Sequence, residues 1–337
     1  MNRSDWRWPR SRMNTMHSRI AILAALLLAL AGCSGGGQPG AAPDAAAALA
    51  AEGAAPLTIA HRQGETVLPA PPRRVVVQDI AVLDILDALD VDAVIGAPGV
   101  NLPDYLAHYG AAPYVQTGTL QEPDYEAIHA AKPDLVILGG RSRTKLQEVS
   151  RIAPAIDLSV DNADLVEGVK ANIGLLGEVF GRQQRAGELI AELDARFATL
   201  RERTAGAGTA VVLVTNAGRL GVYGPNSRLS WIFSEAGFKP VIDEVDDRFH
   251  GGDSVSFEFL LEADPDWMFV VDRDAGTGTG QGAAHRLLDN ALVRQTTAWK
   301  EGGVVYLDPV PAYVVMHGFT SVSALADQVL EAVAARP

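Results

Sequence analysis

Residues 264–273 read Asp264-Pro265-Asp266-Trp267-Met268-Phe269-Val270-Val271-Asp272-Arg273, and their pattern indicates the fold class most clearly. Its Pro-Asp pair predicts a turn, and the apolar run that follows predicts a buried β-strand. Residues 132–141, Lys-Pro-Asp-Leu-Val-Ile-Leu-Gly-Gly-Arg, repeat the same order of turn, strand and arginine. Each stretch also follows the end of a predicted helix, so the unit indicates parallel α/β packing in two places. We therefore expect two similar α/β lobes with a ligand cleft between them.

The rest of the chain continues this alternation on both sides of the two stretches. We expect strands at 74–77, 91–96, 135–138, 155–158, 210–215, 220–223, 267–271 and 304–307, and helices at 80–89, 123–131, 230–236, 256–263, 284–289, 292–296 and 320–335. Residues 161–203 contain no proline and carry an apolar stripe at helical spacing, broken once at 180–182. These patterns predict an N-terminal lobe at 57–160, a linking helix of two stacked segments at 161–203, and a C-terminal lobe at 204–337.

The N-terminus is predicted to direct the protein to the cell envelope rather than to join the fold. Five arginines precede an apolar run, residues 20–30, that is too short to span a bilayer. A basic segment followed by a short apolar segment is typical of a secretory signal. The only cysteine of the chain, Cys33, directly follows Leu-Ala-Gly and resembles the lipidated cysteine of a bacterial lipobox. An ordinary signal peptide with an incidental cysteine is the alternative. We expect a signal peptide at 1–32, a lipid on Cys33 and a Gly-, Ala- and Pro-rich tether at 33–56.

Charge and motif content argue against several classes of function. The chain has a formal net charge of −13, so neither a nucleic acid nor an anionic lipid surface is expected as a partner. The sequence contains no Gly-x-Ser-x-Gly elbow, Walker loop or His-Glu-x-x-His motif. Residues 276–282 imitate a dinucleotide-binding turn, but no acidic residue follows on a second strand about 20 positions later, which favours a flexible cleft loop. An envelope enzyme that binds a nucleotide at this turn is the alternative from another class.

Four arginines are candidates for binding an anionic ligand. Arg141 and Arg273 each end a buried strand in the two equivalent stretches, and ligands gather at the strand ends of open α/β sheets. Arg228 follows a turn-rich loop, and Arg143 is the less certain fourth candidate. A guanidinium presents a planar fork of donors that suits an oxygen-rich anion. One such arginine alone would more simply be a solvated side chain, but two at matched strand ends favour a ligand contact.

A histidine and a tyrosine form a second pair of candidates. His250 lies in a loop beside two glycines, and Tyr313 follows the last predicted strand. Imidazole nitrogen and phenolate oxygen both bind iron, and phenolate is a hard donor suited to a ferric ion. His317, four residues beyond Tyr313, competes for the same role. From spacing alone, a core tyrosine and a hydrogen-bonded loop histidine are the simpler interpretation.

Six stretches from residue 73 to the C-terminus together match one known family. They lie at 74–77, 132–141, 223–228, 264–273, 288–293 and 305–309, the last three reading Asp-Pro-Asp-Trp-Met-Phe-Val-Val-Asp-Arg, Leu-Asp-Asn-Ala-Leu-Val and Val-Tyr-Leu-Asp-Pro. On these motifs the chain resembles the substrate-binding lipoproteins of bacterial iron–siderophore ABC importers. The similarity is to the catecholate branch, which includes enterochelin and petrobactin binders.

The resemblance implies a fold and a ligand. The fold is two Rossmann-like lobes joined by a long rigid helix, the class III periplasmic binding protein fold of the helical-backbone metal receptors. The ligand is a ferric siderophore, whose anionic catecholate oxygens Arg141, Arg228 and Arg273 would surround. His250 and Tyr313 would complete the iron coordination when the siderophore offers only four donors.

The resemblance also implies which proteins this chain would work with. It implies a protein that is not an enzyme, holds no intrinsic cofactor, and delivers its ligand to an ABC permease and its ATPase. One surface acid on each lobe, Glu122 and Glu235, would contact the permease, although solvated helix-end charges explain them equally simply. Haem, cobalamin or a bare metal ion bound by the same fold is the alternative. Bare zinc or manganese would need convergent His and acidic residues, which the sequence does not show.

Overall fold

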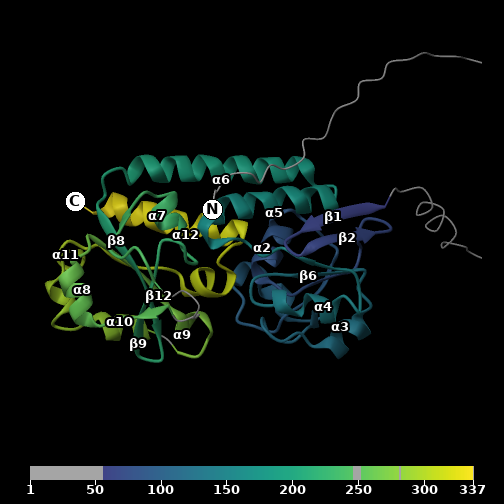
Figure 1. Ribbon diagram of the computed structural model, residues 1–337, viewed down its shortest axis with the longest axis horizontal. Coiled ribbons are helices and arrows are strands. Elements are labelled where there is room, and N and C mark those ends of the chain that lie inside the picture. The colour runs from purple at the N-terminus through teal and green to yellow at the C-terminus, as the bar shows by residue number, and fades with distance from the viewer. Residues whose placement is uncertain (1–55, 246–251, 281, 337) are drawn as a thin grey trace, which may run out of the picture. The chain divides into compact units, whose positions relative to one another are not determined.

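A five-stranded parallel sheet forms the centre of the first lobe (Figure 1). The computed structural model describes residues 56–245, 252–280 and 282–336, so the predicted signal peptide, Cys33, the tether up to residue 55 and His250 lie outside the described residues. The strand order is β5 (Val115–Gln116), β4 (Val94–Ala97), β3 (Val75–Val77), β6 (Leu135–Leu138) and β7 (Ala155–Asp157). Because the chain winds outward from β3 in both directions, the winding reverses between β3 and β6. Ligands of open parallel sheets bind in the crevice at such a reversal.

The second lobe is built on a six-stranded mixed sheet. Its order is β11 (Asp253–Ser254), β9 (Arg219–Tyr223), β8 (Thr209–Asn216), β12 (Trp267–Asp272) and β13 (Val304–Tyr306), and β10 (Lys239–Pro240) also pairs with β8. Strands β8, β10, β12 and β13 are parallel, whereas β9 pairs antiparallel with β8 and β11 pairs antiparallel with β9. The register of β8 and β12 places Thr215 beside Asp272. The next residues, Asn216 and Arg273, therefore lie together at one edge of the sheet.

The two Pro-Asp turns have the same structure in both lobes, which confirms the predicted repeat. The preceding helices end at Lys132 and Asp264, and both residues adopt the left-handed conformation, with φ of 49° and 36°. The aspartate after each proline then accepts hydrogen bonds from backbone N–H groups where the neighbouring strand begins. Asp134 accepts two at 2.8 and 2.9 Å ahead of β3, and Asp266 accepts one from Thr209 at 2.7 Å.

Short helices and one hairpin cover the sheets. The first lobe contains α2 (Ile80–Ala88), α3 (Tyr125–Ala131), α4 (Leu146–Val149) and the hairpin of β1 (Leu57–His61) and β2 (Gly64–Leu68). The second contains α7 (Trp231–Ser234), α8 (Phe257–Ala263), α9 (Arg273–Gly276), α10 (Ala283–Leu288) and α11 (Thr297–Lys300). Short segments of 3-10 or π helix occur at η1 (Asp104–Gly110), η2 (Arg143–Lys145), η3 (Asn162–Asp164), η4 (Val293–Gln295) and η5 (Pro311–Val315). The predicted helix at 292–296 is only the single turn η4, since Thr296 leaves the helical conformation and begins α11 as its N-cap.

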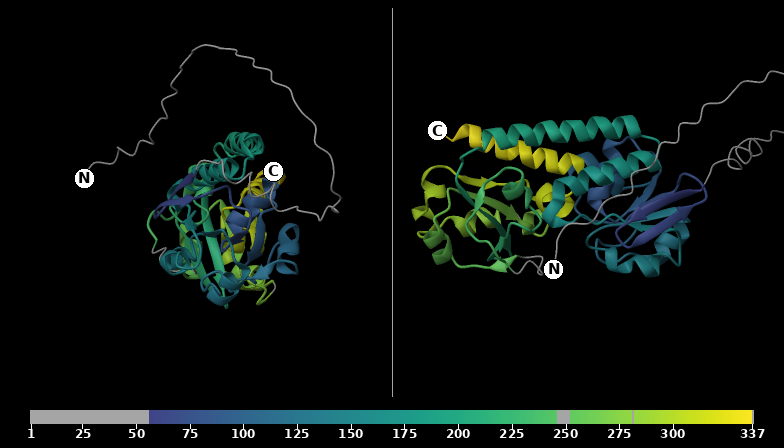
Figure 2. Two further views of the ribbon diagram at one scale, coloured as in Figure 1. Left: turned by 90° about the vertical axis from the view of Figure 1, so that its right-hand side faces the viewer. Right: turned by 45° about the horizontal axis from the view of Figure 1, so that its top comes forward.

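Three longer helices connect the lobes. Residues 161–203 form α5 (Leu165–Val179) and α6 (Gln183–Arg203), which pack against each other because Gly181, with φ of 67°, reverses the chain between them. The C-terminal helix α12 (Phe319–Ala335) packs against both α6 and α2. Figures 1 and 2 show α12 beside α6 over the second lobe, with α6 continuing over the first lobe. One continuous apolar core contains buried residues of both lobes and of these helices, which makes the link between the lobes stiff.

A fully buried carboxylate fixes the start of α12 to the first lobe. Asp84 of α2 accepts hydrogen bonds from the backbone N–H groups of Thr320 at 2.8 Å and Ser321 at 3.0 Å. It also accepts one from the hydroxyl of Tyr105 at 2.7 Å. A Cβ atom on Gly318 would lie 2.4 Å from the Asp84 carboxylate, so only glycine fits there. Asp84 thus supplies acceptors to N–H groups that a helix start leaves without partners.

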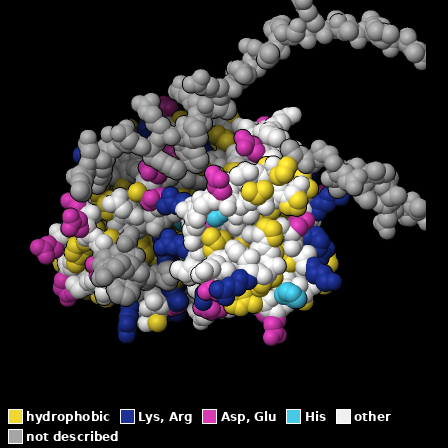
Figure 3. Space-filling view, turned by 45° about the vertical axis from the view of Figure 1, so that its right-hand side comes forward, with side chains coloured by type: hydrophobic (Ala, Val, Ile, Leu, Met, Phe, Trp, Pro, Cys, Tyr) yellow, Lys and Arg dark blue, Asp and Glu magenta, His cyan; other side chains and the backbone are white. Residues whose placement is uncertain are grey.

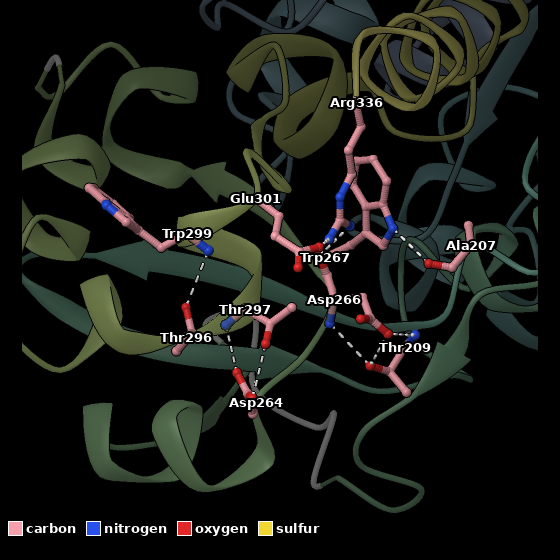
Figure 4. Close-up of polar contacts among 10 residues, drawn as sticks. All are labelled: Ala207, Thr209, Asp264, Asp266, Trp267, Thr296, Thr297, Trp299, Glu301 and Arg336. Atoms are coloured by element: carbon pink, nitrogen blue, oxygen red, sulfur yellow. Dashed lines mark hydrogen bonds and ion pairs between the residues drawn. The ribbon is translucent and has the colours of Figure 1, made fainter.

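Arg336 attaches the other end of α12 to the second lobe (Figure 4). Its guanidinium lies over the Trp267 ring, 4.6 Å from the centroid, donates to the carbonyl of Asp266 at 2.8 Å, and pairs with Glu301. The Trp267 indole donates to the carbonyl of Ala207 at 2.9 Å, which connects the same site to the chain entering β8. Helix α12 is therefore held at both ends by polar contacts, one to each lobe. Within the described ranges, no helix combines the length and apolar character that a bilayer crossing requires.

Replacing Asp84 by alanine should destabilise the whole described fold. The variant leaves the buried Thr320 and Ser321 N–H groups and the Tyr105 hydroxyl without this acceptor, so we expect the free energy of unfolding to fall by about 2–4 kcal/mol. Asp87→Ala, one turn along the same helix and partly exposed, serves as control and should cost less than about 1 kcal/mol. Urea denaturation measures both; equal losses in the two variants would contradict the role of Asp84.

Candidate functional site

A pocket of about 370 Å³ is lined by residues of both lobes. The first lobe contributes Asp79, Ala81, Gly140, Arg141, Arg143, Val160 and Asn162, the second contributes Tyr223, Ser227 and Arg228, and the segment before α12 contributes Val315, Met316 and His317. On the face drawn in Figure 3, Lys and Arg side chains gather along the boundary between the lobes. The volume is within the range of small-molecule sites, and its location between lobes is a common one for ligands.

Strand ends at the reversal point of the first sheet supply one wall of this pocket. Asp79 follows β3 and caps α2, accepting from the N–H groups of Ala81 at 2.9 Å and Val82 at 3.2 Å. Gly139, at the end of β6, approaches so closely that a Cβ there would lie 2.0 Å from the Asp79 carboxylate. Burial raises the pKa of Asp79, while the nearby charge of Arg141 acts in the opposite direction.

Arg141 reaches from the first lobe to the turn η5 that precedes α12. Its guanidinium donates to the carbonyl of Val314 at 2.9 Å and to the carbonyl of Tyr313 at 2.5 Å. Burial lowers the pKa of Arg141, and the positive charge of Arg228 lowers it further. Two guanidinium groups are thus held close enough in a poorly solvated place to repel each other, an arrangement that an anionic ligand would stabilise.

Three arginines converge on Tyr313. The guanidinium carbons of Arg141, Arg228 and Arg273 lie 5.8, 5.9 and 5.4 Å from the centroid of its ring. The Nε of Arg273 also donates to the Tyr313 hydroxyl at 2.9 Å, and its Nη1 donates to Asn216 at 2.9 Å across the edge of the second sheet. Tyr313 itself is buried, so its ring fixes the spacing of the three cations.

The structure brings four of the five predicted ligand-binding residues together. Arg141 and Arg228 line the pocket, whereas Arg273 and Tyr313 stand immediately behind its lining. Arg273 begins α9 rather than ending β12, because the Asp272 side chain caps a new helical turn at this point. Arg143, the less certain candidate, does line the pocket. His250 lies outside the described residues and remains a prediction.

His317 contributes a neutral imidazole to the pocket wall. Burial, followed by the charges of Arg141 and Arg228, lowers its pKa to about 3, so the ring is uncharged at neutral pH. Its Nε2 atom is buried and has no hydrogen-bond partner in the described part of the chain. In the same ranges, no group of three or more His, Cys, Asp or Glu side chains is arranged to hold a metal ion.

The sequence analysis missed one residue that lines the pocket, and two residues that it predicted to be functional lie outside the pocket. The rule that selected Arg141, a polar residue just after a buried strand, applies equally to Asp79 after β3 and would have found it. The two predicted docking acids lie outside the pocket. Glu122 is exposed and pairs with Lys145 at 2.8 Å, and Glu235 pairs with Arg201 at 2.5 Å.

The glycine-rich segment that begins at Gly276 belongs to the region between the lobes. Asn101 of the first lobe donates to the carbonyl of Gly276 at 2.9 Å, and a Cβ on Gly276 would lie 2.6 Å from the carbonyl oxygen of Pro309. The first glycine is therefore required by close packing against the chain that leads to η5. This explanation needs no nucleotide.

Comparison with known protein families gives one match that covers most of the chain. Residues 75–311 match the family described as periplasmic binding protein. Two similar curated proteins are the petrobactin-binding protein YclQ of Bacillus subtilis and the ferric-anguibactin-binding protein FatB of Vibrio anguillarum. YclQ is 31% identical over 81% of this chain and 87% of its own length, and FatB is 30% identical over 94% and 98%.

A solved structure with the same fold is the periplasmic catecholate-siderophore binding protein VctP of Vibrio cholerae. It is 31% identical, with a TM-score of 0.76 over 83% of this chain and 100% of that one. The agreement extends over both lobes and the connecting helices, which confirms the predicted fold class.

The neutral state of His317 should be visible in the pH dependence of stability. The folded-state pKa of about 3 lies below the ordinary value of 6.5, so between these values the unfolded chain binds the extra proton and stability falls as pH falls. Relative to His317→Gln, the natural protein should lose roughly 2 kcal/mol between about pH 7 and about pH 4.5.

Urea denaturation at a series of pH values measures this difference. His129→Gln, which removes an exposed histidine of α3, is the control and should follow the natural protein. A difference between the natural protein and His317→Gln that stays constant across this range would show that the imidazole is not held neutral.

Proposed function

The chain belongs to the periplasmic binding protein family, and on that premise we propose that it captures a ferric siderophore between its two lobes. It would act as the extracytoplasmic substrate-binding protein of an ABC importer, with a catecholate siderophore as its ligand. The observation that carries the proposal is the convergence of three guanidinium groups within 5.4–5.9 Å of the Tyr313 ring centroid. The names of YclQ, FatB and VctP, which specify siderophores as the ligands of those proteins, support it.

The charge of the ligand explains the arginine cluster. A ferric catecholate complex is an oxygen-rich anion, and its deprotonated oxygens accept the charge-assisted hydrogen bonds that a guanidinium fork donates. Binding such a complex relieves the repulsion that lowers the pKa of Arg141. On a chain with a formal net charge of −13, this local group of cations is the feature that attracts and holds an anion.

Tyr313 and a histidine are the candidates for direct contact with the iron. The Tyr313 hydroxyl is held by Arg273 and would supply a hard oxygen donor to a ferric ion with unfilled coordination positions. His250 is the proposed second donor. Both roles apply only when the siderophore supplies four donors, because six catecholate oxygens would leave the iron no free position.

The alternative ligands receive less support from the pocket. Three guanidinium groups repel a bare cation, and the described residues offer no convergent set of His, Cys, Asp or Glu for zinc or manganese. Haem would offer these arginines only its two propionate carboxylates, and cobalamin is not an oxygen-rich anion. Haem and cobalamin are therefore included as competing ligands in the binding experiment.

Further proposals concern the membrane and the transporter. We propose that residues 1–32 are a signal peptide, that Cys33 carries a lipid, and that residues 33–56 tether the lobes at 57–160 and 204–337, linked by 161–203, to a membrane. Delivery to a permease and its ATPase would use Glu122 and Glu235, one acid on each lobe. Each acid already pairs with a basic side chain, Glu122 with Lys145 and Glu235 with Arg201 of α6. Docking would therefore require these ion pairs to be exchanged for contacts with the permease.

Tryptophan fluorescence should report binding by the purified protein. Trp231 and Trp267 are buried and Trp299 is partly exposed, so a strongly absorbing ferric catecholate in the pocket should quench their emission in a saturable way. The probe is the ferric complex of bis(dihydroxybenzoyl)cadaverine, which offers four catecholate oxygens. Absence of quenching by ferric catecholates, together with saturable quenching by haem or cobalamin, would overturn the proposal.

The same titration tests which arginines hold the chelate. Arg273→Ala removes the contact with the Tyr313 hydroxyl and one of the three converging charges, so we expect affinity for this probe to fall by roughly tenfold or more. Arg143 is exposed and solvated, so Arg143→Ala should weaken the same probe by less than about threefold. Equal losses would count against the strand-end assignment of Arg273.

A further inference from the structure

A second hollow of about 290 Å³ adjoins the ligand pocket on the first lobe. It is lined by Arg62, Gln63, Arg143, Thr144, Asp157 and Ser159, and we call it the annex. Arg143 lines both the annex and the main pocket, and Val160 of the main pocket directly follows Ser159. The main pocket and the annex therefore adjoin, with the Arg143 side chain belonging to the lining of both.

Hydrogen bonds fix the β1–β2 hairpin turn at the annex. The Arg62 N–H donates to the carbonyl of Asp157 at 3.1 Å. The Gln63 side chain donates both to the Asp157 carboxylate and to the carbonyl of Arg143, each at 2.8 Å. These bonds hold the hairpin turn against the end of β7 and the turn that carries Arg143, so Arg62 and Arg143 both line one hollow.

The Asp157 carboxylate within the annex is already hydrogen-bonded by neutral donors. Asp157 is 2% exposed and accepts from the Gln63 amide, from the Ser159 N–H at 2.9 Å and from the Ser159 hydroxyl. Its carboxylate is therefore not the partner of either arginine. Arg62 pairs only loosely with Asp161, at 3.6 Å with both side chains 56% exposed.

Arg143 is the cation that this arrangement leaves available. Its backbone is fixed by Gln63, its side chain is exposed, and the ion pairs formed among the described residues do not include it. A guanidinium that lines two adjoining hollows and has no carboxylate partner in the described part of the chain is suited to a bidentate contact with a carboxylate.

We propose that the annex binds a carboxylate on the backbone of the siderophore whose catecholate groups occupy the main pocket. Arg143 is the specificity-determining residue, and Arg62 supports it. The inference rests on the proposed function and narrows it, since the preferred ligand is then a catecholate siderophore that also carries a free carboxylate. A chelate without the carboxylate would leave Arg143 hydrated and gain nothing from the annex.

A matched pair of chelates tests the annex separately from the main pocket. Bis(dihydroxybenzoyl)lysine and bis(dihydroxybenzoyl)cadaverine have the same two catechols and the same linker, but only the lysine compound carries a carboxylate. The natural protein should bind the ferric lysine chelate about tenfold more tightly, and this preference should shrink as salt concentration rises because Arg143 is exposed.

Variants then assign the preference to a residue. In Arg143→Gln the preference should fall below about threefold, whereas Arg151→Gln, which changes an exposed arginine of the same lobe outside both hollows, should retain it in full. Equal affinity for the two chelates in the natural protein, or an unchanged preference in Arg143→Gln, would overturn the annex and leave the main pocket intact. Failure of both chelates to bind would instead overturn the catecholate assignment on which the annex rests.

Discussion

The turn η5 and the start of α12 are the part of the chain on which the binding pocket depends, because both lobes hold them. Arg141 of the first lobe donates to two carbonyls of this turn, and Asp84 of the same lobe accepts from the first N–H groups of α12. Arg273 of the second lobe donates to the hydroxyl of Tyr313 within the turn. The segment therefore positions the aromatic ring around which the cations gather, and it also couples that ring to the packing of the lobes.

The proposed function follows from the repulsion among guanidinium groups that the fold holds close together. Burial and mutual repulsion disfavour the charged form of Arg141, yet strand ends and the Tyr313 ring hold three guanidinium groups in one place. Such a group is stable because its cations donate to carbonyl, amide and hydroxyl oxygens and because Arg273 also pairs with Asp274 at 3.6 Å. An oxygen-rich anion would add charged partners for Arg141 and Arg228. The common core of the lobes and the bridging helices keeps the arrangement nearly rigid, so the pocket is largely formed before a ligand arrives.

Much of the fold was predictable from the sequence because the same local pattern, a helix end, a Pro-Asp turn and a buried strand, occurs twice. The two Pro-Asp turns end helices at left-handed residues and cap the neighbouring strand, and the rule for strand ends then placed Arg141 and Arg273 near each other. The β1–β2 hairpin was missed because its pattern is weak: Ile59 and Leu68 are buried while Val67 is 59% exposed, and β7 supplies much of its support. The neutral state of His317 depends on contacts between distant segments, which spacing along the chain does not reveal, whereas Asp79 was open to the same strand-end rule. His250 stays a prediction, since it lies outside the described residues.

The location of the iron tests the account most directly. Crystals of the protein with a bound ferric bis-catecholate, measured at the iron absorption edge, would show the ion as a single anomalous peak. We predict that peak in the pocket between the lobes, beside Tyr313 and with catecholate oxygens within hydrogen-bonding distance of Arg141 and Arg228. A peak elsewhere, such as in the hollow lined by His285, Trp299 and Tyr306 on the second lobe, would contradict it.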